Sequence, residues 1–177
     1  MNIILIGYRA CGKSSVGKIL AQKLNYTFVD CDFLISERLK SSISSYVALN
    51  GWHKFRIMET EILAEILQYD NQVIATGGGI VVSHEACKLL KQQPYTVWLA
   101  ASCENIARRI KADESSHSMR PPLGNFKNLT NEVRFTLTER SPLYTDCANI
   151  IINGDLLTPE QITNEIIQVW HLTPTEF

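Results

Sequence analysis

A glycine-rich run near the N-terminus has the residue types and spacing of a phosphate-binding loop. Gly7 and Gly12 bracket four residues, and Lys13 and Ser14 follow directly. This is the P-loop pattern: its glycines let backbone amides approach phosphate oxygens, its lysine reaches the β- and γ-phosphates, and its hydroxyl holds Mg²⁺. An apolar segment precedes the run and a helical pattern follows it, so a helix N-terminus adds partial positive charge. The pattern predicts nucleotide binding but names no acceptor for a phosphate.

Two carboxylates stand at the end of the next apolar segment, "FVDCD". Asp30 and Asp32 are two residues apart, so they project to the same side at the carboxyl end of a strand, where open α/β sheets bind ligands. One carboxylate could help to hold Mg²⁺ through water, and the other could accept a proton from a hydroxyl group. For either residue alone, capping of the following helix is the competing interpretation.

A second polar cluster follows in "KFRIMET" and "ATGGGIV". Arg56 and Glu59 are three residues apart on one helix face, and in isolation a surface ion pair is the favoured interpretation. Gly77, Gly78 and Gly79 directly follow a predicted strand. Three successive glycines suit a turn at which a ligand touches the backbone.

Four arginines in the C-terminal half complete the set of candidates. Arg108 and Arg109 are adjacent on a predicted helix, so one can be solvated while the other stacks on a base. Arg120 lies in "MRPPL" and Arg140 in "ERSPLY". Each arginine alone is more often a solvated surface group. Together with a P-loop they indicate recognition of phosphate and carboxylate and neutralisation of charge during phosphoryl transfer.

Short apolar segments alternate with amphipathic ones along the chain, which predicts a parallel sheet covered by helices on both faces. The predicted strands are 2–7, 26–30, 72–76, 95–100 and 149–153. The predicted helices are 13–24, 32–50, 54–69, 83–92, 102–112, 131–143 and 158–170. Thr158 and Gln161 have the spacing of a capping box at the start of the last helix. Residues 113–128 lack periodicity and are rich in turn formers, as in a functional lid.

Composition describes an ordinary globular chain of 177 residues, for which one domain is expected. Lys and Arg total 17 against 18 for Asp and Glu, so no global field favours nucleic acid or a membrane. No transmembrane run or secretory signal is recognisable, and we expect a cytoplasmic monomer. Five scattered cysteines fit reduced thiols rather than a disulfide framework or a zinc site. Among them, Cys11 is interpreted as a small loop filler rather than a reactive thiol.

The complete set of motifs resembles that of the shikimate kinases over nearly the whole chain. The matching segments are "IGYRACGKSS", "FVDCD", "FRIMET", "VIATGGGIV", "MRPPL" and "ERSPLY", in this order. The resemblance implies a three-layer α/β fold of the P-loop kinase type, with a five-stranded parallel sheet in the order 2-3-1-4-5. It also implies transfer of the γ-phosphate of ATP to the 3-hydroxyl of shikimate, with Mg²⁺, on the route to aromatic amino acids.

The same resemblance assigns expected functions to individual residues. Asp32 would bind the shikimate hydroxyls as the candidate base, and Lys13 and Arg120 would complete the catalytic set. The residues expected to contact ATP are Gly7, Ala10, Cys11, Gly12, Lys13, Ser14, Ser15, Arg109 and Arg120. The residues expected to contact shikimate, within an acceptor region at about 32–62 and beyond it, are Asp32, Phe55, Arg56, Gly78, Gly79 and Arg140. Ser14 and Asp30 would lie at the metal.

Two features depart from the family pattern. Gly51-Trp52 stands where many members have Gly-Glu, and Ala75-Thr76 leaves no acidic residue where a Walker-B-like strand ends. Ser14, Asp30 and water would then have to supply the metal ligands. The alternatives are a related small-molecule kinase, acting on gluconate or a nucleotide, and an inactive nucleotide-binding regulator. A neutral or nucleoside acceptor would not need both Arg56 and Arg140.

Overall fold

The strands of the protein form one parallel sheet in the order β2-β3-β1-β4-β5, as expected. The computed structural model describes residues 1–112 and 128–172. The strand bounds agree with the predicted segments to within one residue at each end. They are β1 (Ile3–Ile6), β2 (Thr27–Asp30), β3 (Gln72–Ala75), β4 (Thr96–Ala100) and β5 (Ile150–Asn153).

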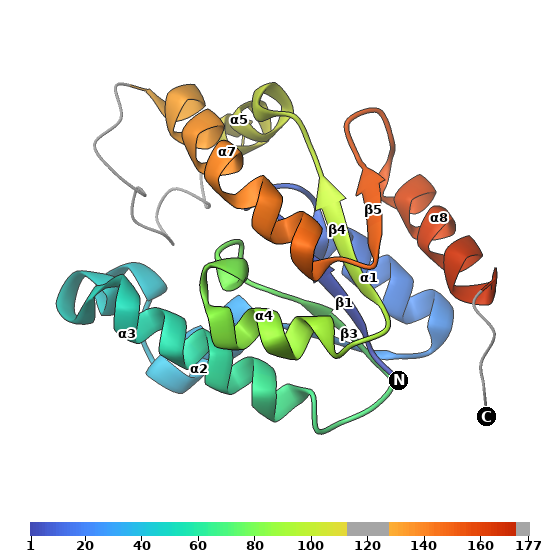
Figure 1. Cartoon of the computed structure of the whole chain (residues 1–177), viewed down its shortest axis with the longest axis horizontal. Helices are drawn as coiled ribbons and strands as arrows, with labels where there is room; N and C mark the ends of the chain where they lie inside the picture. The colour runs from blue at the N-terminus through green and yellow to red at the C-terminus, as the bar shows by residue number, and fades with distance from the viewer. Residues whose placement is uncertain (113–127, 173–177) are drawn as a thin grey trace.

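Helices cover both faces of the sheet and make three layers (Figure 1). In β1 the side chains alternate: Ile3 and Leu5 pack with α1 (Lys13–Leu24) and α8 (Pro159–Leu172). Ile4 and Ile6 join the opposite cluster, to which four helices contribute: α2 (Cys31–Leu39), α3 (Ile43–Ile66), α4 (His84–Lys91) and α7 (Leu129–Cys147). Helix α5 (Cys103–Ala112) packs against α7 in a smaller third cluster. A strand buried on both faces explains the unbroken apolar run in the sequence.

The boundary between α2 and α3 differs from the predicted one. The first helix ends at Leu39, where Lys40 adopts a left-handed conformation, and the second begins after Ser42, whose side chain accepts a hydrogen bond from the Ser45 amide. The predicted gap at 51–53 lies inside α3, where Gly51 has φ 79° and ψ 163°. The backbone at Gly51 is not helical, so two helical segments meet at a kink there, as the predicted gap indicates. Glycine reaches this positive φ without a steric penalty.

Helix α7 is longer than predicted. It begins at Leu129, where the Asn128 side chain accepts a hydrogen bond from the Asn131 amide, and it continues past Pro142 to Cys147. A proline inside a helix removes one backbone hydrogen bond but does not always end the helix. The continuation places Arg140 and Tyr144 on one rigid element. The short 3-10 helix η1 (Ile80–Val82) was not predicted, whereas the capping box at Thr158 and Gln161 is present.

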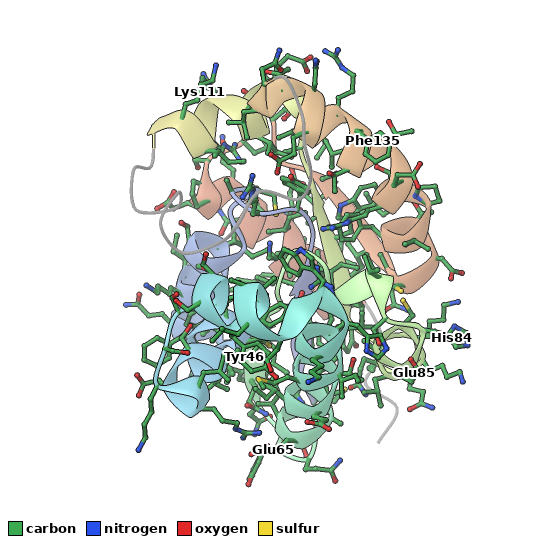
Figure 2. All side chains as sticks on the ribbon, turned by 90° about the vertical axis from the view of Figure 1, so that its left-hand side faces the viewer. Tyr46, Glu65, His84, Glu85, Lys111 and Phe135 are labelled. Atoms are coloured by element: carbon green, nitrogen blue, oxygen red, sulfur yellow. The ribbon has the colours of Figure 1, made fainter. Side chains whose placement is uncertain are left out.

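Figure 2 shows the molecule from the left-hand side of Figure 1. Tyr46 and Glu65 mark α3 in the lower half, and Lys111 of α5 and Phe135 of α7 mark the upper half (Figure 2). The described residues predicted to do chemistry come from the loop before α1 and the start of α1, the end of β2 and the start of α2, the glycines after β3, and helices α3, α5 and α7. Within the described ranges, no helix is both long and apolar enough to cross a membrane.

Candidate active site

The loop between β1 and α1 has the backbone conformation that its glycines predict. Gly7 has φ 139° and Gly12, which precedes α1, has φ 108°. A β-carbon on Gly7 would lie 2.7 Å from the Leu99 carbonyl oxygen and 2.9 Å from Cys11 Sγ, so no larger residue fits there. Ala10 also has positive φ, at 60°. The loop is therefore wound tightly at the N-terminus of α1, where a helix dipole favours an anion.

The Lys13 side chain lies over this loop. It is only 8% exposed, and its ammonium group donates hydrogen bonds to the carbonyls of Gly7, at 2.8 Å, and Tyr8, at 2.9 Å. Cys11 is buried in the same loop, with its sulfur 3.7 Å from Lys13 Nζ. Its position agrees with the interpretation of Cys11 as a loop filler. A cation is thus held beside the amides that close the loop.

A hydrogen bond links Ser14, in the first turn of α1, to Asp30, the last residue of β2. The Ser14 hydroxyl donates to Asp30 Oδ2 at 2.8 Å, and Asp30 Oδ1 accepts from the amides of Asp32, at 3.1 Å, and Phe33, at 3.3 Å. Asp30 is therefore the N-cap of α2 as well as the partner of Ser14. A hydroxyl and a carboxylate oxygen are hard donors of the kind that Mg²⁺ prefers, so this donor set fits the expected metal. At the end of β3, by contrast, the Thr76 hydroxyl donates to the Leu5 carbonyl at 3.1 Å.

A cavity of about 680 Å³ brings the predicted nucleotide residues together with a candidate base. Its lining includes the P-loop from Ala10 to Ser15 together with Asp32, Gly78 and Arg109. Arg109 donates to the carbonyls of Cys11, at 3.2 Å, and Gly154, at 3.1 Å, so it ties the P-loop to the segment after β5. Its neighbour Arg108 is exposed and donates to Asn105 at 2.7 Å. Arg109 thus lines the cavity and Arg108 is solvated, while the stacking of Arg109 on a base stays a prediction.

Arg56 and Glu59 form an ion pair, but the pair is not on the surface. The Glu59 side chain is 2% exposed and that of Arg56 is 15% exposed. The surface interpretation of this i,i+3 pair is therefore wrong. The guanidinium carbon also lies 5.0 Å from the centre of the Trp52 ring, within cation–π range. Burial raises the pKa of the Glu59 carboxyl, and the positive charge of Arg56 opposes this effect.

The glycine turn after β3 makes room for these side chains. A β-carbon on Gly79 would collide with the Arg56 guanidinium group. A β-carbon on Gly77 would collide with Glu59 Oε1 and lie 3.0 Å from Asp32 Oδ1. Both glycines are thus explained by close approach of the protein's own charged side chains. That a ligand also touches this turn stays a prediction.

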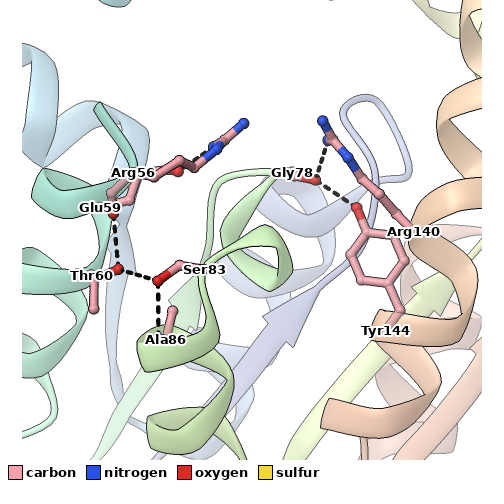
Figure 3. Close-up of polar contacts among 8 residues, drawn as sticks. All are labelled: Arg56, Glu59, Thr60, Gly78, Ser83, Ala86, Arg140 and Tyr144. Atoms are coloured by element: carbon pink, nitrogen blue, oxygen red, sulfur yellow. Dashed lines mark hydrogen bonds and ion pairs between the residues drawn. The ribbon is translucent and has the colours of Figure 1, made fainter. Parts of the chain in front are cut away.

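Gly78 anchors the other wall of the site. Its carbonyl oxygen accepts hydrogen bonds from Arg140 Nη1, at 3.0 Å, and from the Tyr144 hydroxyl, at 2.5 Å. Burial raises the pKa of Tyr144, so this hydroxyl remains a donor. Figure 3 shows the guanidinium groups of Arg56, from α3, and Arg140, from α7, reaching toward the same space beside Gly78.

Both arginines line a second cavity of about 910 Å³, between α3, the start of α4 and α7. The hydroxyls of Thr60 and Ser83 are hydrogen-bonded at 2.9 Å, and Ser83 caps α4, so α3 and α4 are tied at its base (Figure 3). Gly78 lines the first cavity and binds Arg140 of the second. The two cavities therefore adjoin at the glycine turn.

Some residues lie elsewhere than expected, and others had no mark in the sequence. Phe55 is buried against Trp52 and lines neither cavity. Arg120 and the predicted lid, apart from Asn128, lie outside the described residues. Arg9 lines the first cavity and forms a buried ion pair at 2.9 Å with Glu132, 123 positions away. No local pattern links Arg9 to Glu132, so sequence reasoning could not find this contact.

The site combines a P-loop, at the edge of a parallel sheet in the order 2-3-1-4-5, with a carboxylate and two arginines beside it. This combination defines a P-loop kinase that acts on a small molecule. The sequence model of the shikimate kinase family matches residues 9–171. The chain belongs to the shikimate kinase family.

Individual relatives agree with this assignment. Shikimate kinase 2 of Photorhabdus laumondii is 39% identical over 171 residues, which cover 96% of each chain. Shikimate kinase of Caldicellulosiruptor bescii is 36% identical, with 95% of this chain and 94% of that protein covered. The structure of shikimate kinase from Acinetobacter baumannii in complex with shikimate has a TM-score of 0.89 at 30% identity, and covers 96% of this chain and 92% of that one.

Proposed function

We propose that this protein transfers the γ-phosphate of ATP to the 3-hydroxyl of shikimate, giving shikimate 3-phosphate and ADP for the biosynthesis of aromatic amino acids. Family membership supports the reaction. The observation that carries it is that Arg56 and Arg140 converge beside the cavity that contains Lys13 and Asp32. Shikimate has one carboxylate and several hydroxyls, so it needs forked cations at one end and a carboxylate at the other.

The proposed reaction depends on positioning and electrostatics. The acceptor hydroxyl oxygen attacks the γ-phosphorus in line, the bond from that phosphorus to the bridging oxygen breaks, and ADP leaves. Asp32 lies on the first turn of α2 and lines the same cavity as Lys13, so it is placed to accept the hydroxyl proton. Lys13 would exchange its bonds to loop carbonyls for phosphate oxygens, where a cation stabilises the transferring group.

Ser14 and Asp30 would hold Mg²⁺, because their oxygens already lie 2.8 Å apart at the mouth of the P-loop. When bound, the ion neutralises phosphate charge. Arg109 would lie against adenine, while Gly78 and Gly79 would offer backbone contacts to shikimate. Arg120 and closure of the segment 113–128 stay predictions from the sequence. The expected monomer, the cytoplasmic location and the absence of nucleic-acid and membrane partners stay predictions as well.

A coupled assay of ADP release tests the function. Shikimate, gluconate and nucleoside monophosphates are supplied in parallel with ATP and Mg²⁺. We expect strong ADP release only in the reaction that contains shikimate as the acceptor. Release with gluconate or a nucleotide would assign the chain to another kinase class, and no release with any acceptor would favour a nucleotide-binding regulator.

Replacing Arg140 with alanine is expected to raise KM for shikimate about 10-fold or more, because a charge-assisted hydrogen bond contributes roughly 1.5–3 kcal/mol. KM for ATP should change little, since Arg140 bonds to Gly78 and lines the cavity on the acceptor side. Steady-state kinetics with each substrate varied in turn would measure both constants. The exposed Arg108→Ala is the matched control. An unchanged KM for shikimate in Arg140→Ala would contradict the assignment.

Replacing Gly79 with alanine is expected to displace Arg56, because the new β-carbon would occupy the position of its guanidinium group. We expect a higher KM for shikimate together with a loss of about 1–3 kcal/mol in the free energy of unfolding, as for other overpacked sites. Chemical denaturation and kinetics of the same sample would measure both effects. A fully stable variant with normal shikimate kinetics would show that Arg56 is not held in this way.

A further inference from the structure

Two cysteines outside the candidate active site are in contact with each other. Cys87 lies on α4 and Cys147 is the last residue of α7, and the two helices pack together (Figure 1). The two thiols interact within one core cluster, beside the ion pair of Lys91 and Asp146 that joins the same two helices. Both cysteines are reduced in this structure. A disulfide forms only between cysteines on closely neighbouring elements, and the packing of α4 against α7 meets this condition.

An ion pair lies beside the two thiols. Lys91, one turn after Cys87, forms an ion pair at 2.6 Å with Asp146, the residue before Cys147. The hydrogen bond from Cys147 lowers the pKa of Cys87, and the Lys91 charge acts in the same direction against burial and Asp146. The same hydrogen bond and burial raise the pKa of Cys147. Cys87 is 9% exposed against 2% for Cys147, so it is the thiol that peroxide reaches first.

We propose that Cys87 and Cys147 are an oxidative modification site, at which hydrogen peroxide converts the two thiols into a disulfide that joins α4 to α7. The contact between the sulfurs and the packing of the two helices carry this inference. It is independent of the phosphoryl-transfer function, because neither cysteine lines the two cavities described above.

The chemistry uses one peroxide molecule for each disulfide. The Cys87 thiolate attacks a peroxide oxygen, the oxygen–oxygen bond breaks, and hydroxide leaves and is protonated to water. Cys87 is then a sulfenic acid. The Cys147 sulfur, having lost its proton, attacks the Cys87 sulfur, and the sulfur–oxygen bond breaks with release of a second water. Two thiols lose two electrons and two protons in total, and the peroxide gains them.

The location of the pair connects it to the glycine turn. The Cys87 thiol also donates to the Val81 carbonyl at 3.2 Å, in η1 directly after Gly79. Cys147 lies three residues after Tyr144, which donates to Gly78. Disulfide formation removes the Cys87 proton and with it the hydrogen bond to Val81. The modification therefore links two segments that both contact the same turn.

Treatment of the folded protein with hydrogen peroxide, followed by alkylation under denaturing conditions, tests the proposal. We expect three alkylated cysteines instead of the five in the chain, and before alkylation a mass lower by about 2 Da from the loss of two hydrogens. Peptide mapping should find Cys87 linked to Cys147, and dithiothreitol should restore five free thiols. Retention of all five thiols, or modification of Cys11 in place of this pair, would overturn it.

Three variants separate the two steps of the reaction. Cys147→Ser should stop at the sulfenic acid on Cys87, which dimedone traps as an adduct visible by mass spectrometry. Cys87→Ser should abolish both the adduct and the disulfide. Cys31→Ser, which changes a buried cysteine whose pKa burial raises, is the matched control and should keep the loss of two thiols. Circular dichroism establishes that each variant is folded. A disulfide that still forms in Cys87→Ser would also overturn the assignment.

Discussion

Replacing Lys13 with alanine is expected to lower kcat with shikimate and ATP by about 10²–10³-fold, the usual effect of removing one preorganised charge from a transition state. Lys13 is the buried cation of the P-loop, and its ammonium group is held by the carbonyls of Gly7 and Tyr8 beside the helix N-terminus. Charge develops on the phosphate oxygens during transfer, so the ammonium group stabilises the transition state more than the ground state. An alanine side chain cannot supply this difference.

Steady-state ADP release measures this effect, and Lys18→Ala is the matched control. Lys18 lies on the same helix but is exposed, so its removal should leave kcat unchanged. Because Lys13 also bonds to two loop carbonyls, thermal unfolding of the variant should be recorded alongside. A folded Lys13→Ala protein with the turnover of the wild type would contradict the P-loop assignment.

Replacing Asp32 with asparagine is expected to lower kcat by about 10²–10⁴-fold, the range for loss of a general base. The amide has nearly the size of the carboxylate but cannot take the proton of the acceptor hydroxyl. Asp32 lines the cavity that contains Lys13, and its Oδ1 lies close to Gly77, at the edge of the acceptor region. The variant should therefore keep KM for ATP while turnover falls.

The pH dependence of kcat separates proton transfer from simple orientation. With aspartate, kcat should fall at acidic pH as the carboxylate is protonated, and this fall should be absent in Asp32→Asn. Glu37→Gln, an exposed carboxylate on the same helix, should retain the wild-type profile. If Asp32→Asn keeps wild-type turnover at neutral pH, then Asp32 is not the base.

Local patterns in the sequence were sufficient for most of the fold. The strands, the P-loop and the capping box at Thr158 are each determined by neighbours within a few residues, so periodicity and spacing predict them. The strand order came from the resemblance to a family, because apolar runs alone do not say which strands are adjacent. Helix limits were less well predicted: the residue type of Gly51 indicated the kink there, but nothing in the predicted pattern indicated the end of α2 at Leu39.

The environment of the site residues was decided by the tertiary structure alone. The spacing of Arg56 and Glu59 predicts an ion pair on the surface or in the core equally well, and it is packing against Trp52 and Gly79 that buries it. Other contacts join residues far apart in the sequence, where helix or strand periodicity gives no signal. Examples are Arg9 with Glu132 and Cys87 with Cys147.

Sequence by itself therefore determined which chemistry is present: a phosphate cradle, two carboxylates and several arginines. Only the tertiary structure decided which of these groups share a cavity, which are paired and which are solvated. The physical reason is that residue type and spacing act over one or two helical turns, whereas burial and charge pairing depend on elements that the fold brings together from distant parts of the chain.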